Sequence, residues 1–208
     1  MTVKNITTEL ANWFRKELDD RLAYFLGGIW HESLRDLTKK VFDKFAPKNI
    51  VEAPSSSSGK YHPEDECGVG GWLLHAERVA KLSNKLGEAF DLAPYEQDLL
   101  RAASLLHDLL QFTDNPMDDI KTLKLSTKVE HGNMIAEAIE TIAMFNKEKL
   151  LAKIVKLHSG KWGAGEAATE WQSMLAKIDR GDLLAMLFHV ADYIASRRYI
   201  KIEKEEDN

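Results

Sequence analysis

Cysteine is almost missing from the sequence, and long apolar runs and an excess of positive charge are missing altogether. Cys67 stands alone, so no disulfide can form within the chain and a thiolate metal site is ruled out, which fits a reducing cytoplasm. No run approaches the roughly 18 apolar residues that a membrane-spanning helix needs. The net charge of −5 gives no general attraction to nucleic acid or anionic lipid, although a local basic groove for nucleic acid stays open. We expect a cytoplasmic protein without a membrane segment.

The alternating apolar pattern of β-strands is also missing, and helical periodicity takes its place. Apolar residues recur every three to four positions over 8–26, 34–45, 72–90, 94–110, 129–145, 149–158 and 183–199. The intervening stretch 47–70 is rich in Ser, Gly and Pro, which predicts a long loop. We therefore predict an all-α protein made of an N-terminal helical pair (1–50), a loop (51–70), a helical bundle (71–200) and a solvated acidic tail (201–208).

The stretch SLLHDLL places His107 and Asp108 side by side among leucines. Burying a carboxylate and an imidazole is costly unless a partner compensates them, and a divalent cation would be such a partner. Further candidates follow at intervals of about one helix plus a connection, so successive helices of a bundle could bring them to one interior point. In chain order the set is His75, His107 with Asp108, His131, His158 and Asp192. His31 and His189 lie outside this set and are interpreted as structural residues.

The ordered set resembles the pattern H…HD…D of the HD superfamily of metal-dependent phosphohydrolases. The similarity covers roughly residues 61–198 and is carried by GGWLLHAERVAKL, AASLLHDLL and FHVADYIASRR. The resemblance implies an HD-type helical domain in which a first divalent metal is bound by His75, His107, Asp108 and Asp192. Many members continue the HD pair with Gly-Lys, whereas Leu109-Leu110-Gln111 follows here, so a basic residue is absent from that place.

Two further histidines, in KVEHGNMIAEAI and IVKLHSGKWG, look like those of two-metal members of the same superfamily. By this resemblance His131 and His158 would hold a second metal, with Asp108 as the bridge. Histidine and carboxylate ligands without thiolate favour iron or manganese and leave nickel, cobalt, zinc and magnesium open.

The predicted function is hydrolysis of a nucleotide or a related small phosphate ester through a metal-activated water. Two cations about 3.5 to 4 Å apart would activate that water and neutralise charge on phosphoryl oxygens. Asp108, His107 and Lys161 are the predicted catalytic residues, and Lys161, Arg197 and His62 are the predicted substrate-binding residues. The pattern does not choose between phosphomonoesters and phosphodiesters, and it does not fix the oligomeric state.

Two other functions fit the same residues. Some members with this six-residue pattern resemble di-iron oxygenases, which would consume dioxygen. A metal-stabilised module that binds a nucleotide without catalysis is the second alternative. Phosphate release that is indifferent to oxygen would favour hydrolysis over both.

Overall fold

The computed structural model describes residues 3–174 and 178–198, in which helices are joined by loops. These residues contain no β-strand, so the all-α prediction is confirmed. The α-helices are α1 (Val3–Gly27), α2 (Glu32–Phe45), α3 (Gly71–Ala89), α4 (Pro94–Leu106), α5 (His131–Glu140), α6 (Asn146–Leu157), α7 (Gly165–Met174) and α8 (Arg180–Ala195). Three short 3₁₀ helices accompany them, η1 (Ile50–Glu52), η2 (Glu64–Glu66) and η3 (Gly160–Trp162).

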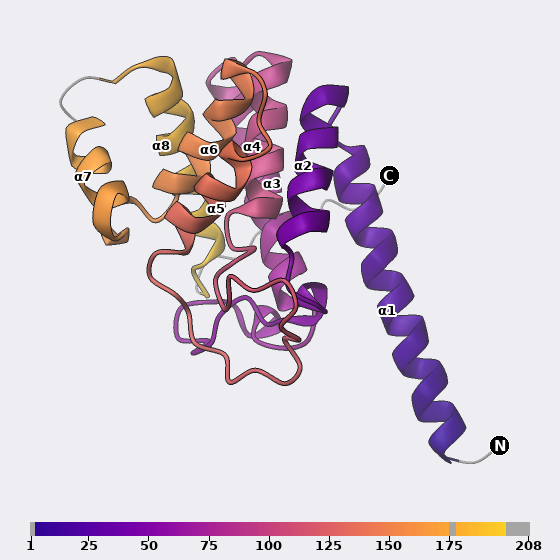
Figure 1. The fold of residues 1–208 in the computed structure, drawn as a ribbon. Coiled ribbons are helices and arrows are strands. Elements are labelled where there is room, and N and C mark those ends of the chain that lie inside the picture. Colours follow the sequence, from indigo (N-terminus) through magenta and orange to yellow (C-terminus); the bar gives the residue numbers. More distant parts are fainter. Residues whose placement is uncertain (1–2, 175–177, 199–208) are drawn as a thin grey trace.

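The centre of the bundle is formed by α3, α4, α6 and α8, which pack against one another. Their facing sides carry fully buried apolar residues such as Leu73, Leu99, Ile154 and Phe188. The helix α5 covers α6, α2 packs on α4, and α7 contacts α6 and η3 at one edge (Figure 1). The helix α1 lies along the side of the bundle and extends beyond it (Figure 1).

Two helices show how local sequence sets their ends. Pro94 occupies the first turn of α4, where its missing N–H costs no hydrogen bond. Asp179 caps α8: its Oδ1 accepts from the backbone N of Asp182 at 2.7 Å, and Asp182 Oδ2 accepts from the backbone N of Asp179 at 2.9 Å. Asp182 also pairs with Lys153 of α6 at 2.7 Å, which ties the start of α8 to its neighbour.

Several predicted helix ends differ from the observed ones. The helix predicted to reach residue 110 ends at Leu106, and the one predicted to start at 183 already starts at Arg180. The helix α7 was not expected, because its apolar pattern is short and rich in small residues. The predicted acidic tail, 201–208, lies outside the described residues.

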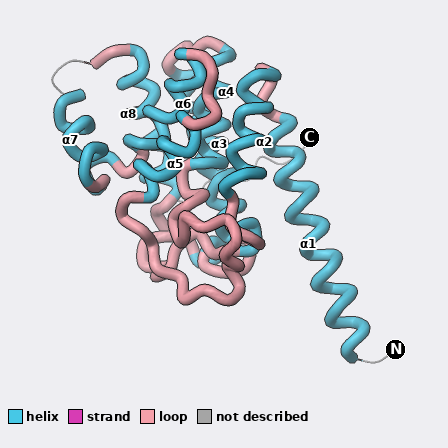
Figure 2. The backbone as a smooth tube through the Cα atoms, in the orientation of Figure 1, coloured by secondary structure: helices cyan, strands magenta, loops and turns pink. Residues whose placement is uncertain are grey.

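Long loops gather at one end of the bundle (Figure 2). Lys48 and Asp119 join the loop after α2 to the loop after α4 by a β-bridge, with backbone bonds from Lys48 N to Asp118 O (2.9 Å) and from Ile120 N to Lys48 O (3.1 Å). Asn49 Nδ2 adds a bond to Asp119 Oδ1 at 2.8 Å. The loops therefore form a connected layer over the helix ends.

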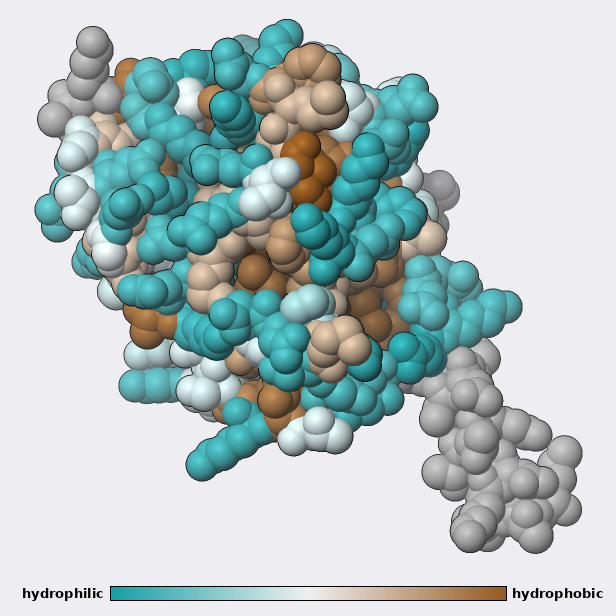
Figure 3. Space-filling model, in the orientation of Figure 1, coloured by the Kyte–Doolittle hydropathy of each residue, from teal (hydrophilic) through white to brown (hydrophobic). Residues whose placement is uncertain are grey.

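The face shown in Figure 3 is mainly polar, with small separate apolar areas. No helix among the described residues combines the length and the hydrophobicity that crossing a bilayer requires.

Candidate metal centre

Six side chains from five segments meet at the loop end of the bundle. Each comes from the end of a helix or the turn next to it: the second turn of α3, the turn after α4, the first residue of α5, the cap of α6 and the last turn of α8. Helix ends of antiparallel neighbours lie at one level, so residues far apart in sequence become neighbours. The six are His75, His107, Asp108, His131, His158 and Asp192.

One half of the centre is formed by His75, His107 and Asp192. Asp192 Oδ1 lies 3.1 Å from His75 Nε2 and 3.7 Å from His107 Nε2. The two Nε2 atoms are 3.4 Å apart. Asp108 Oδ2 reaches the same group, 3.5 Å from His107 Nε2. Two nitrogens and two carboxylates therefore point at one small volume.

The other half is formed by His131 and His158, again with Asp108. Asp108 Oδ1 lies 3.0 Å from His131 Nε2 and 3.7 Å from His158 Nε2, and the two imidazole nitrogens are 2.9 Å apart. Each oxygen of Asp108 thus faces a different set of histidines, which is the arrangement that a bridging carboxylate requires. The backbone carbonyl of Asp108 is fixed in turn by Trp72 Nε1 at 3.2 Å.

The tautomer of three histidines is set by backbone carbonyls three residues earlier. His107 Nδ1 bonds to Ser104 O at 3.0 Å, His131 Nδ1 to Lys128 O at 2.5 Å, and His158 Nδ1 to Val155 O at 2.6 Å. A carbonyl can only accept, so each Nδ1 is the donor, and in the neutral ring Nε2 is left with a free lone pair. These rings are therefore held with Nε2 aimed at the centre, as a nitrogen ligand requires.

His75 is supported from behind by a buried carboxylate, Glu66 of η2. Glu66 is fully buried and lies 3.3 Å from His75 Nδ1, close enough for charge attraction but outside good hydrogen-bond geometry. Its oxygens also contact His62 Nδ1 at 2.8 Å and Arg78 Nη1 at 2.6 Å. Burial raises the pKa of Glu66, but the contacts with His62, His75 and Arg78 outweigh it and lower the pKa to about 2. An ionised carboxylate behind a ligating histidine is a common support of metal sites.

The ionisable groups of the centre affect one another strongly because they are buried together. Burial alone would lower the pKa of His75, but the contacts with Asp192 and Glu66 raise it to about 10. For His158, burial and the neighbouring imidazoles act together and lower the pKa to about 4. Burial tends to raise the pKa of Asp108 and Asp192, yet the histidines around them hold it well below the ordinary range. Both aspartates are therefore ionised.

The donor set fits divalent cations. Four imidazole nitrogens and two ionised carboxylates converge in two neighbouring groups that share Asp108, and all of these donors are nitrogen or carboxylate oxygen. No described Lys or Arg lines the cavity between them, so only the histidines offset the negative charge. A cation would replace protons on the imidazoles as the partner of Asp108 and Asp192.

Two adjoining cavities give access to the centre. The inner cavity has a volume of about 190 Å³ and is lined by all of the six side chains except His107. Its other polar lining residues are His62, Gln111, Ser55, Ser56, Thr127, Ser159 and Ser196. The outer cavity, of about 480 Å³, shares part of this wall and continues along η3 and the end of α8. The Nε2 of Gln111 is buried without a hydrogen-bond partner.

Two of the three predicted substrate-binding residues line the cavities, and the third does not. His62 lines both cavities, and Arg197 lines the outer one. Lys161 is exposed and lines neither cavity: its Nζ lies 4.8 Å from the ring centroid of Trp162, its neighbour in the chain. The catalytic and binding roles predicted for these three residues stay predictions.

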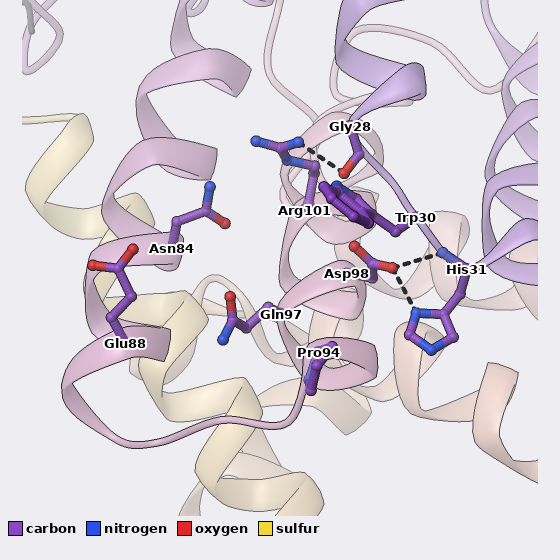
Figure 4. A pocket seen from close by; sticks show the side chains of 9 residues that line it. All are labelled: Gly28, Trp30, His31, Asn84, Glu88, Pro94, Gln97, Asp98 and Arg101. Carbon is purple, nitrogen blue, oxygen red and sulfur yellow. Dashed lines mark hydrogen bonds and ion pairs between the residues drawn. The ribbon is translucent and has the colours of Figure 1, made fainter.

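His31 and His189, which were interpreted as structural, both form hydrogen bonds within the fold. His31 bonds to Asp98 Oδ2 through its backbone N (2.8 Å) and its Nδ1 (2.7 Å), at the edge of a separate cavity of about 470 Å³ that contains no residue of the metal centre (Figure 4). His189 donates from Nδ1 to the backbone O of His158 at 2.6 Å, so it supports a candidate ligand without pointing its Nδ1 into the centre.

Sequence reasoning missed Glu66, Arg78 and Gln111. Glu66 stands in the acidic stretch PEDE, which reads as surface loop, so the sequence carries no signal of its burial. Arg78 follows His75 by three positions, and that spacing on a helix does place both on one face. The sequence gives Gln111 no role, because it stands only as part of Leu109-Leu110-Gln111, a stretch without a basic residue.

Taken together, these observations define a helical domain with a candidate metal centre of His and Asp side chains. A protein-family model described as "HD domain" matches residues 72–197, more than half of the chain, so the chain belongs to the HD domain family. No curated protein and no solved structure matches it. The resemblance drawn from the sequence is confirmed.

Proposed function

We propose that this protein is a metal-dependent phosphohydrolase acting on a nucleotide or a related small phosphate ester. The observation that carries the proposal is the position of Asp108, whose two oxygens face two separate sets of histidine nitrogens in a centre that opens to cavities of substrate size. Membership of the HD domain family, known for metal-dependent hydrolases, supports the same class.

The six side chains would hold two divalent cations, with Asp108 as the shared ligand. His75, His107 and Asp192 would complete the first site, and His131 and His158 the second. Bound cations of this kind lower the pKa of water and neutralise charge on phosphoryl oxygens. Iron or manganese suits six-coordinate sites of histidine and carboxylate, and nickel, cobalt, zinc and magnesium are further candidates.

The inner cavity has the properties of a pocket for a phosphoryl group. Its other polar lining includes hydroxyl groups and the unpartnered amide of Gln111, which donate hydrogen bonds without adding charge. Because no described Lys or Arg lines it, the negative charge of a phosphate would be balanced by the cations. This agrees with the absence of a basic residue from Leu109-Leu110-Gln111, the stretch after the HD pair.

The experiment is a screen for phosphate release by protein loaded with Mn²⁺ or Fe²⁺, with nucleoside mono- and triphosphates, cyclic nucleotides and sugar phosphates as substrates. Each reaction is run with and without oxygen. We expect metal-dependent phosphate release at the same rate in both gases, or, for cyclic nucleotides, metal-dependent formation of the monophosphate. Oxygen uptake without cleavage of any ester would favour the oxygenase alternative. Stoichiometric metal and nucleotide binding without turnover would favour the non-catalytic module.

A further inference from the structure

The outer cavity is lined by an aromatic and cationic group that the metal centre does not use. We call this group, Tyr61, Trp162, Tyr193 and Arg197, the aromatic cleft. The Trp162 and Tyr193 rings are stacked, with centroids 5.6 Å apart and planes 7° from parallel. The Arg197 guanidinium carbon lies 3.9 Å from the Tyr193 centroid and 5.2 Å from that of Tyr61. Four flat groups thus border one cavity of about 480 Å³.

Packing alone does not account for this group. Contacts of Trp162 with His189 and Tyr193 do anchor η3 to α8. Yet the three aromatic residues remain 40 to 54% exposed around the cavity. Large rings that only stabilise a fold are normally covered, whereas exposed rings around a concave surface are typical of ligand sites.

Arg197 adds a second, independent observation. Its guanidinium stacks on tyrosine rings, and no carboxylate among the described residues forms an ion pair with it. Its Nε is buried and has no hydrogen-bond partner. A buried donor without a partner costs free energy, so it is expected where a ligand supplies the acceptor.

The aromatic cleft is continuous with the metal centre through the chain itself. Tyr193 follows the candidate ligand Asp192, and Trp162 follows His158 by four positions. The two cavities share His62, His158, Ser159, Asp192 and Ser196 in their walls. A molecule whose phosphoryl group enters the inner cavity can therefore extend its remaining part into the aromatic cleft.

We propose that the aromatic cleft binds the heteroaromatic ring of the substrate, so that nucleoside phosphates, and not sugar or alkyl phosphates, are the substrate class. This inference rests on the proposed function for its phosphoryl half. The ring would lie against the exposed aromatic faces, where stacking tolerates any base. Arg197 would donate to an acceptor on the ring edge or on the sugar.

The test compares a nucleoside 5′-monophosphate with ribose 5-phosphate, which carries the same reacting group without the base. In wild-type protein we expect a higher kcat/KM for the nucleotide. Trp162→Ala should reduce this preference by about 5–150-fold, mainly through KM, because stacking on one aromatic side chain is worth about 1–3 kcal/mol per base. Trp162→Phe should restore much of it. Trp30→Ala, which removes a tryptophan that is 84% exposed beside the separate cavity of Figure 4, is the matched control and should keep the preference.

A binding measurement separates this inference from the proposed function. Titration calorimetry with unphosphorylated nucleosides needs no hydrolysis, and binding that is lost in Trp162→Ala and in Arg197→Gln would support the aromatic cleft even if no ester is cleaved. Circular dichroism shows whether each variant folds. If Trp162→Ala does not fold, Arg197→Gln alone provides the test. Equal hydrolysis of nucleotide and ribose 5-phosphate, with a ratio unchanged in the folded variants, would overturn the inference and leave the hydrolase intact.

Discussion

Replacing Asp108 with alanine should remove most of the stabilisation of the protein by divalent metal. Among the described residues, Asp108 is the carboxylate that pairs with histidines of both sets, at 3.0 Å from His131 Nε2 and 3.5 Å from His107 Nε2. Its removal takes an anionic ligand from each proposed site at once. The remaining imidazoles keep their backbone hydrogen bonds, so the helices that carry them should stay in place.

The magnitude follows from linkage between binding and folding. A metal present at 100 times its dissociation constant raises the free energy of unfolding by about 2.7 kcal/mol. For a chain of 208 residues, 1 kcal/mol corresponds to about 2–4 °C in Tm, so each bound metal should raise Tm by roughly 5–11 °C. If Asp108→Ala weakens binding about a hundredfold, the gain at the same metal concentration falls to about 0.4 kcal/mol, or about 1 °C.

The assay is thermal unfolding followed by circular dichroism during a Mn²⁺ titration of chelator-treated protein. His31→Ala is the matched control, because His31 bonds to Asp98 at a distant cavity and should leave the metal-induced shift unchanged. An equal shift in wild type and Asp108→Ala would refute the reasoning, since the metal would then bind elsewhere.

Three further predictions concern the other residues of the centre. His131→Ala and His158→Ala should each lower bound metal from two towards one per chain, measured by elemental analysis with circular dichroism to confirm folding; unchanged stoichiometry in both would leave a single metal site. Glu66→Gln should weaken metal affinity by about 10–100-fold, because it removes the charge that supports His75 and pairs with Arg78, and a competitive chelator titration that finds wild-type affinity would contradict this. Metal binding at neutral pH should release protons, because the pKa of His75 without a cation is raised to about 10, so the ring is protonated until a metal displaces the proton. Calorimetry in buffers of different ionisation enthalpy should show the release, and a binding enthalpy independent of buffer would count against it.

The candidate ligand set could be assembled from the sequence because it follows the order of the helices. The apolar periodicity of α3, α4 and α8 was readable, and each of these helices contributes at a residue near its end. The exact ends of the helices were harder to predict from the sequence. His107 and His158 prove to be caps and not helical residues, and the carbonyl bonds that orient their rings exist only because the helices stop there.

The support of the centre could not be read from the sequence. Glu66 looks like one of several surface acids, and only the contacts with Arg78 and His62 explain its burial. The pairing of Lys48 with Asp119 likewise joins two loops whose composition predicts no partner. Such features depend on tertiary contacts between distant segments, for which local periodicity carries no information.

The most direct test of the central claim is phosphate release from a nucleoside phosphate by one preparation that is stripped of metal with a chelator and then reloaded. The account predicts that activity is lost on stripping, returns on reloading with Mn²⁺ or Fe²⁺, and is absent from reloaded Asp108→Ala. Phosphate release that persists in the stripped protein, or that is equal in reloaded Asp108→Ala and wild type, would contradict it.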